Sequence, residues 1–249
     1  MPLLVVHAEA SWVAVGKPAG MPVVPDDSGD RSLYDEVRAW AKRRRQSGDE
    51  DFVGVVHRLD RPVSGLVLFA LTRAAAASLS EAFKKRRMQK LYWGVVEGRP
   101  RGLGGRCELW LRKHPTRNTV RATVGRAPDA DRAETEWQLL DALPGRTLIA
   151  LRPQTGRSHQ LRVTAQHLGT SLIGDLKYGA ERALSDGSIA LHALGLRGPN
   201  PTGGAPLDLA LAPPDTRVWT AAHERWATGG ARGWKGDKPD AAGHDPRRD

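Results

Sequence analysis

The chain has 249 residues, with 38 lysines and arginines against 28 aspartates and glutamates and a formal net charge of +10. The single cysteine, Cys107, excludes a disulfide framework and a cysteine-based zinc site. The longest apolar run, residues 65–70, is far shorter than the roughly 20 residues of a membrane-spanning helix. We therefore expect a cytoplasmic protein with no membrane contact. Its expected large partner is a polyanion, because lysine and arginine release the counterions of nucleic acid when they bind it.

The first half of the chain predicts short strands interleaved with two helices. Apolar residues closed by a Pro/Gly turn indicate strands within 3–15, and Ser32 is a suitable N-cap for a helix over 32–46. The alanine-rich stretch 72–83 has high helix propensity. Further strands are expected at residues 53–56, 66–71 and 90–96. These helices would carry two basic clusters, 42–45 and 84–87, which are either phosphate contacts or solvated helix faces.

The second half predicts more strands and one helix. Gly, Arg, Thr and Pro are frequent in residues 99–133, which indicates a hairpin-bearing insertion with a loop near 125–132. Helical spacing runs over 158–168 and ends at Gly169. Further strands are expected at residues 134–140, 147–151, 189–196 and 207–211. Such interleaving without regular βαβ units predicts a mixed α/β domain of the α+β type.

After about Glu224 the composition loses its apolar periodicity. Such a segment cannot bury enough apolar area to offset the entropy of the chain. We therefore expect one catalytic domain over residues 1–223 and a disordered tail over 224–249.

The segment His57 to Gly65 reads H-R-L-D-R-P-V-S-G. It places Asp60 close to two arginines, Arg58 and Arg61. Neighbouring cations favour the ionised carboxylate, so Asp60 could act as a nucleophile. The alternative is an ion pair that only stabilises the end of a strand.

A second polar segment, T-G-R-S-H-Q-L-R at 155–162, falls where a strand gives way to a helix. Arg157 and Ser158 would lie at the helix N-terminus, whose free amides and dipole favour a phosphate or carboxylate. Arg157 could therefore face Asp60. The alternative is helix capping by Thr155 or Ser158, with the arginines on the surface.

A third segment, residues 90–98, predicts a strand that carries Lys90 and Tyr92 on one face. A tyrosine there could stack on a flipped base or fill the core. No glycine-rich nucleotide motif occurs, so we expect no cofactor. We also expect no metal site, because the histidines lack metal-binding spacing. We expect these histidines to form structural hydrogen bonds instead: His57, His159, His167 and His192.

Taken together and in this order, these segments resemble the RluA-type RNA pseudouridine synthases. The resemblance covers roughly residues 3–215. The motifs that carry it are W-V-A-V-G-K-P-A-G at 12–20, H-R-L-D-x-x-x-S-G-L at 57–66, K-x-Y-x-x-x-V-x-G at 90–98, T-G-R-x-H-Q-L-R at 155–162 and G-D-L-K-Y-G at 174–179.

This resemblance implies an isomerase that converts uridine to pseudouridine in transfer or ribosomal RNA, without a cofactor. It also implies a mainly antiparallel sheet with flanking helices and a central basic cleft. Asp60 would be the catalytic aspartate, Arg157 its partner and Tyr92 a contact of the target uracil. The substrate-binding residues would be Arg58, which helps to hold the target nucleotide out of its stack, and Lys90, Gln160 and Arg162.

Two other functions stay open at this point. A catalytically inactive RNA-binding protein is disfavoured because Asp60, Tyr92 and Arg157 are all present. A glycosidic-bond hydrolase would need a second carboxylate as general acid, and no motif supplies one. We expect a monomer without the small N-terminal RNA-binding domain of many relatives, so that RNA choice rests on the catalytic domain.

Overall fold

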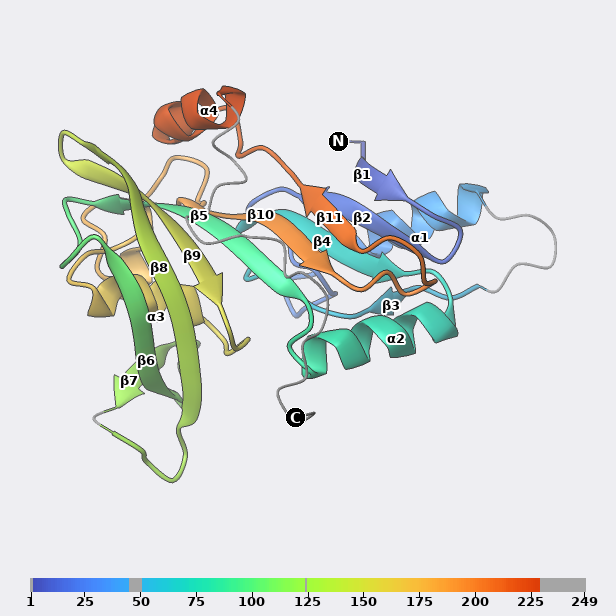
Figure 1. Ribbon diagram of the computed structural model, residues 1–249, viewed down its shortest axis with the longest axis horizontal. Helices are drawn as coiled ribbons and strands as arrows, with labels where there is room; N and C mark the ends of the chain where they lie inside the picture. Colours follow the sequence, from blue (N-terminus) through green and yellow to red (C-terminus); the bar gives the residue numbers. More distant parts are fainter. Residues whose placement is uncertain (1, 45–50, 124, 229–249) are drawn as a thin grey trace, which may run out of the picture.

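The computed structural model describes residues 2–44, 51–123 and 125–228, which form one large mixed sheet with helices packed on it (Figure 1). The strands are β1 Leu4–Ala8, β2 Trp12–Lys17, β3 Gly54–Val55, β4 Ser64–Ala70, β5 Gln89–Glu97, β6 Gly104–Lys113, β7 Val120–Thr123, β8 Asp131–Leu143, β9 Arg146–Pro153, β10 Leu191–Gly198 and β11 Leu207–Ala210. The α-helices are α1 Leu33–Arg44, α2 Arg73–Lys84, α3 Gln160–His167 and α4 Thr220–Ala227, and two 3-10 turns are η1 Leu176–Tyr178 and η2 Arg217–Trp219.

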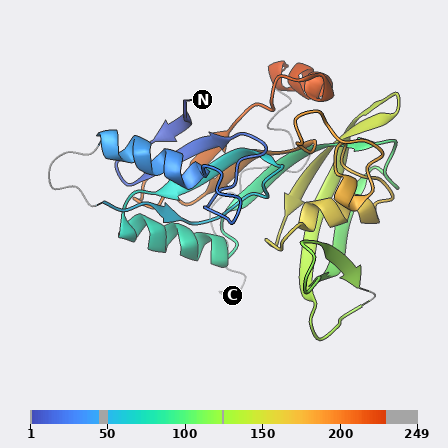
Figure 2. The ribbon, with the colours of Figure 1, turned by 180° about the vertical axis from the view of Figure 1, so that it is seen from behind.

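The strand order is β1-β2-β4-β10-β5-β9-β8-β6-β7, with β11 paired to β10 and β3 to β4. Of the strand pairs in the described residues, β4 with β10 is parallel and the others are antiparallel. This confirms the predicted mainly antiparallel sheet. Figures 1 and 2 show β5 and β10 in the middle, with α1 and α2 beside one half of the sheet and α3 beside the half formed by β6 to β9.

Both faces of the sheet are covered around strand β2, which is fully buried, whereas β6 alternates between buried and exposed residues. Successive side chains of a strand point to opposite faces. Val13 therefore packs in one core cluster with Leu33 of α1, whereas Trp12 packs in another with Leu79 of α2. The sheet is thus the central layer, and its apolar residues form cores on both sides.

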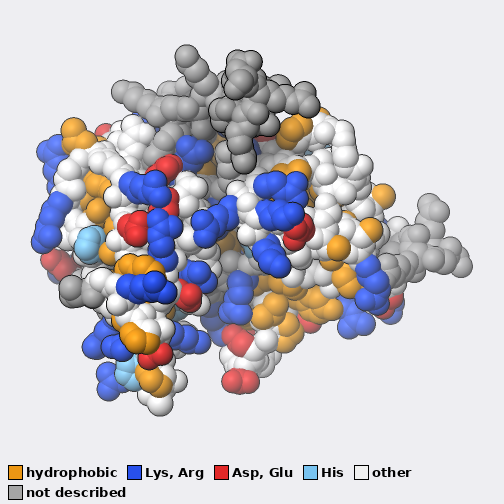
Figure 3. Space-filling view, turned by 60° about the horizontal axis from the view of Figure 1, so that its bottom comes forward, with side chains coloured by type: hydrophobic (Ala, Val, Ile, Leu, Met, Phe, Trp, Pro, Cys, Tyr) orange, Lys and Arg blue, Asp and Glu red, His pale blue; other side chains and the backbone are white. Residues whose placement is uncertain are grey.

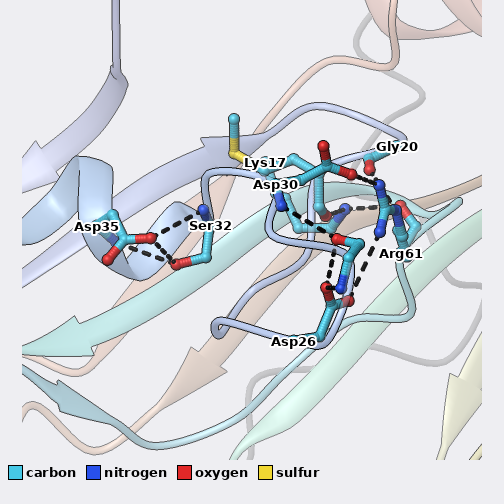
Figure 4. A network of polar contacts seen from close by, with 9 residues as sticks. Lys17, Gly20, Asp26, Asp30, Ser32, Asp35 and Arg61 are labelled. Carbon is cyan, nitrogen blue, oxygen red and sulfur yellow. Dashed lines mark hydrogen bonds and ion pairs between the residues drawn. The ribbon is translucent and has the colours of Figure 1, made fainter.

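The start of α1 follows the sequence prediction. The Ser32 hydroxyl accepts a hydrogen bond from the Asp35 amide, and the Asp35 carboxylate accepts bonds from the Ser32 amide and hydroxyl (Figure 4). This reciprocal capping satisfies amide groups that would otherwise lack partners at the helix N-terminus. The helix ends at Arg44, and the remaining predicted residues 45–46 lie outside the described residues.

The predicted boundary at Glu224 is wrong by several residues, because α4 continues to Ala227. Trp226 explains the difference: its ring packs edge-to-face on that of Trp93, with centroids 6.5 Å apart. Tertiary contact thus orders residues whose local composition predicts no structure. The rest of the predicted tail, 229–249, lies outside the described residues. No helix in the described ranges is long and apolar enough to span a membrane.

Strand β4 begins directly after the segment that carries Asp60, and Gly65 allows this start. Its φ of +128° is a conformation that residues with a side chain rarely adopt, and a Cβ atom would lie 2.4 Å from the Ala193 nitrogen. The missing side chain therefore lets β4 and β10 approach closely at the edge where Asp60 is located.

Candidate active site

A cleft of about 580 Å³ opens beside the loop between β3 and β4, the start of β5 and the start of α3. Lysine and arginine side chains gather along the hollow between the two halves of the molecule (Figure 3). All seven residues predicted as catalytic or substrate-binding line the cleft, so the structure brings them together: Arg58, Asp60, Lys90, Tyr92, Arg157, Gln160 and Arg162.

Lys17 fixes the backbone next to Asp60. Its buried ammonium donates hydrogen bonds to the carbonyl oxygens of Met21 (2.6 Å), Pro18 (2.9 Å) and Arg61 (3.0 Å). Burial lowers the pKa of Lys17 to about 7, against the opposing effect of the Asp60 charge. The turn at the end of β2 is thereby tied to the loop that carries Asp60.

The arginines beside Asp60 in the sequence do not bind its carboxylate. Arg61 forms ion pairs with Asp26 and Asp30 and donates from Nε to the Gly20 carbonyl, and so points toward the loop after β2 (Figure 4). Arg58 is exposed at the cleft, where it forms no ion pair or hydrogen bond with the described residues. Neither arginine therefore forms an ion pair with the Asp60 carboxylate in the described residues, because Arg61 points toward the loop after β2 and Arg58 is exposed.

The cation beside Asp60 is Arg162. Its Nη1 atom lies 3.6 Å from Asp60 Oδ2, and its Nε and Nη2 atoms donate to the two carboxylate oxygens of Asp175 at 2.7 and 2.6 Å. The guanidinium also lies over the ring of Tyr178, 4.8 Å from the centroid. The side chains of Arg162 and Asp175 are 5% and 1% exposed, so this arginine is held rigidly at the base of the cleft.

Arg157, the predicted partner of Asp60, points elsewhere. Its Nη1 atom lies 3.4 Å from the Asp131 carboxylate, and its Nε donates to the Arg132 carbonyl. The predicted pairing is therefore wrong. In the structure α3 begins at Gln160, two residues later than predicted, and Arg157 lies in the segment before the helix, where it contacts the start of β8.

Gln160 and Arg162, which were expected to bind substrate, line the cleft and also have partners within the protein. The Gln160 amide donates to the Glu134 carbonyl and the Thr135 hydroxyl and accepts from the Thr155 hydroxyl and the Arg157 amide. A carboxamide has two donor hydrogens and one acceptor oxygen, so this side chain is fully used within the protein. Gln160 fixes α3 to β8, whereas Arg162 fixes Asp60.

Strand β5 presents Lys90 and Tyr92 to the cleft, and Trp93 is buried in the core on the opposite face, as the alternation predicts. Burial, with a smaller effect of the Asp60 charge, raises the pKa of Tyr92, so its phenol stays neutral. Burial lowers the pKa of Lys90 to about 8, and its ammonium donates to the Thr155 carbonyl. Strand β5 therefore contributes an aromatic ring and one cation to the cleft.

Two further residues lie beside Asp60: His159, for which the sequence predicted only structural hydrogen bonds, and Tyr178, for which it predicted no role. His159 Nε2 lies 3.9 Å from Asp60 Oδ2, and its Nδ1 atom lies 2.6 Å from the Tyr178 hydroxyl. Both residues belong to segments that carry the family resemblance, T-G-R-S-H-Q-L-R and G-D-L-K-Y-G. Their place in these motifs is the feature of the sequence that could have identified them as site residues, although a motif does not show which atoms are in contact.

Two other histidines have the predicted structural role. His57 accepts the Leu68 amide hydrogen at Nε2, and His192 Nδ1 lies 2.9 Å from the Ser64 hydroxyl. Burial lowers the pKa of His57 to about 3 and that of His192 to about 4, so both are neutral. Within residues 2–44, 51–123 and 125–228, no group of three or more His, Cys, Asp or Glu side chains could hold a metal ion.

A carboxylate beside a buried arginine, in a cleft rich in lysine and arginine, fits an enzyme that acts on nucleic acid. Comparison with known proteins is more specific, because residues 11–167 match the family model described as RNA pseudouridylate synthase. The chain belongs to this family, whose members are isomerases that convert uridine in RNA to pseudouridine. The RluA-type resemblance is thereby confirmed.

Individual relatives agree with the family. The chain is 36% identical to an uncharacterised RNA pseudouridine synthase of Zymomonas mobilis, over 78% of the chain and 87% of the relative. It is 31% identical to the ribosomal large subunit pseudouridine synthase D of the same organism, over 88% and 72%. It spans 52% of another relative, from Chloroflexus aurantiacus. The solved structure of human RNA pseudouridylate synthase domain containing 4 shares the fold, with a TM-score of 0.73, 24% identity and coverage of 90% and 93%.

Proposed function

We propose that this chain isomerises specific uridines of a structured RNA and that Asp60 is the carboxylate that acts on the target nucleotide. The observation that carries the proposal is the position of Asp60 in a basic cleft, 3.6 Å from the buried guanidinium of Arg162. A buried cation fixes the position of a carboxylate. Asp60 is 30% exposed at its side chain and is therefore accessible from the cleft.

The surrounding side chains suit a nucleotide that leaves its helical stack. Tyr92 offers a neutral ring to the uracil, since aromatic side chains stack on unpaired bases. The exposed Arg58 can occupy the space that the flipped base vacates in the RNA. Both an attack of Asp60 on the anomeric carbon and the removal of a sugar proton by Asp60 need an ionised carboxylate beside the ribose.

In this proposal the RNA binds through electrostatic contacts between its phosphates and lysine and arginine side chains of the cleft. Lys84 and Arg86, at the end of α2, line the cleft together with the more buried Lys90. Cations around a cleft neutralise phosphates and supply affinity without sequence preference. The proposed substrate is transfer or ribosomal RNA. Ribosomal RNA should be tested first as the substrate, because several curated relatives are named for the large ribosomal subunit.

Mapping of pseudouridine in total RNA tests the proposal. Cells that lack the gene should lose one or a few pseudouridines, and expression of the wild-type chain should restore them. Asp60→Asn should restore none, although the variant folds and binds RNA with unchanged affinity. Restoration by this variant would exclude Asp60 as the reacting group.

The two alternative functions give different results in the same cells and with purified protein. A hydrolase would release free uracil and leave abasic sites. A binding protein without catalysis would leave the pseudouridine map unchanged in the deletion strain.

A further inference from the structure

We infer that His159 is a positioning residue for Asp60, and that Tyr178 fixes the tautomer in which the His159 Nε2–H points at the Asp60 carboxylate. This inference rests on the proposed role of Asp60. It assigns a function to two buried side chains that the proposed chemistry does not otherwise use.

The backbone of His159 is the first argument. His159 is the N-cap of α3 and has a φ of 53°, in the left-handed region, yet its side chain forms no capping hydrogen bond. A residue with a side chain in this region is uncommon and costs conformational energy. At this N-cap the unusual backbone instead directs the imidazole toward Asp60, with Nε2 3.9 Å from Oδ2.

The hydrogen bonds of Tyr178 decide the tautomer. Its hydroxyl oxygen accepts the Val120 amide hydrogen at 2.9 Å, and His159 Nδ1 lies 2.6 Å from the same oxygen. In the part of the chain that the structure describes, the Tyr178 hydrogen has no acceptor except Nδ1. Tyr178 is 3% exposed, and an unpaired buried O–H is costly. Tyr178 therefore donates to Nδ1, and the proton of the neutral ring is on Nε2.

Tyr178 is itself held from two sides. Strand β7 supplies the Val120 amide, and Lys177 Nζ donates to the Asn118 carbonyl in the turn before β7. The Arg162 guanidinium covers the ring of Tyr178. The hydroxyl that orients His159 thus has little freedom to move.

The charges around His159 favour the neutral ring. Burial is the largest effect and lowers the pKa of His159; Arg162 on α3 and Lys177 on η1 lower it further. Asp60 on the β3–β4 loop and Asp175 before η1 raise it. A neutral ring orients Asp60 through one N–H, whereas an imidazolium would form an ion pair with the carboxylate and weaken it as a nucleophile or base.

The distance of 3.9 Å from Nε2 to Oδ2 is longer than a hydrogen bond. Catalytic hydrogen bonds are often long in the free enzyme and shorten when substrate is bound. We therefore expect this contact to close in the RNA complex, where the substrate excludes water from the cleft.

Three variants test the inference under single-turnover conditions with a substrate RNA. His159→Gln keeps an N–H donor near the position of Nε2, whereas the shorter His159→Asn cannot reach Asp60. Asparagine also tolerates a positive φ, so it can adopt the left-handed conformation that the N-cap of α3 requires at position 159. We expect His159→Asn to lower the rate by about ten- to a hundredfold and His159→Gln to retain most of it. RNA affinity should be unchanged in both.

The pH dependence of the rate in Tyr178→Phe distinguishes orientation of His159 by Tyr178 from a purely structural role of Tyr178. Phenylalanine keeps the ring under Arg162 but no longer donates to Nδ1, so the imidazole is protonated more readily. The acid limb of the rate against pH should therefore move to higher pH, by roughly one unit.

The outcomes separate this inference from the proposed function. If the wild-type protein forms pseudouridine and Asp60→Asn does not, the proposed function is supported, whatever the results for the His159 and Tyr178 variants. Equal rates in wild type, His159→Asn and His159→Gln would overturn the inference. Should the histidine variants fail to fold, the pH profile of Tyr178→Phe decides, and an unmoved acid limb overturns the inference.

Discussion

The guanidinium of Arg162 lies 3.6 Å from the carboxylate of Asp60, although the two residues are about a hundred positions apart in the chain. Two hydrogen bonds to the buried Asp175 fix the orientation of this guanidinium. Asp60 therefore meets a cation whose position is set by α3 and by the turn before η1, and not by its own loop.

This pairing predicts that Arg162→Lys lowers the single-turnover rate by about ten- to a hundredfold, because lysine cannot bind Asp175 through a planar fork. Retaining a positive charge avoids leaving Asp175 buried and unpaired. The matched change, Arg157→Lys, should cost less than about fivefold, because its ion pair with Asp131 is exposed. Rates measured at saturating RNA compare the two variants, and an equal loss in both would contradict the assignment of Arg162.

Lys17 predicts a dependence of stability on pH. Its folded pKa of about 7 is below the value near 10.4 of an unfolded lysine, so the unfolded chain binds more protons between these limits. The free energy of unfolding should therefore rise with pH in this window, by up to about 1.4 kcal/mol per pH unit from this group.

Urea unfolding at several pH values between 7 and 9 measures the effect as the difference between wild type and Lys17→Met. Lys90, whose pKa is lowered to about 8, contributes in the same direction to both proteins and cancels in the difference. The exposed Lys42 provides the control, since Lys42→Met should leave the slope as it is. A slope unchanged by Lys17→Met would show that Lys17 titrates as an ordinary lysine.

Gly65→Ala should destabilise the protein by more than about 4 kcal/mol, because the new Cβ atom would overlap the backbone of Ala193 and the φ of +128° would be strained. Gly203→Ala is the control: its φ is +83°, but no atom lies within 4 Å of the added carbon. This second change should cost about 1 to 2 kcal/mol from backbone strain alone. Chemical denaturation curves distinguish the two, and similar losses would exclude the close approach of β4 and β10 as the cause.

RNA binding should weaken steeply as salt is added. Neutralising Lys84 and Arg86 to glutamine should reduce the slope of log affinity against log salt by about 0.7 to 0.9 for each phosphate that the protein no longer neutralises. These side chains are exposed at the cleft and outside the catalytic motifs, so the rate at saturating RNA should be unchanged. The same changes at Lys42 and Arg43, which do not line the cleft, serve as the control, and equal slopes in all three proteins would exclude the α2 cluster as a phosphate-binding site.

Most strands and helices could be predicted from the sequence because their signals are local. The alternation in β5 correctly places Lys90 and Tyr92 on the cleft face and Trp93 in the core. The N-cap at Ser32 correctly begins α1. Helix α4 was missed because Trp226 is ordered by its contact with Trp93, which is remote in sequence.

The sequence by itself determined that the seven predicted site residues gather in one cleft, because all seven belong to motifs that carry the family resemblance. Only the tertiary structure decided which cation faces Asp60. The place of Arg157 at the predicted helix N-terminus favoured this residue, but in the structure α3 begins at Gln160, Arg157 pairs with Asp131, and Arg162 lies beside Asp60. The direction of a side chain depends on the backbone conformation at its own position and on the elements packed around it, and neither is encoded in the distance between motifs along the chain.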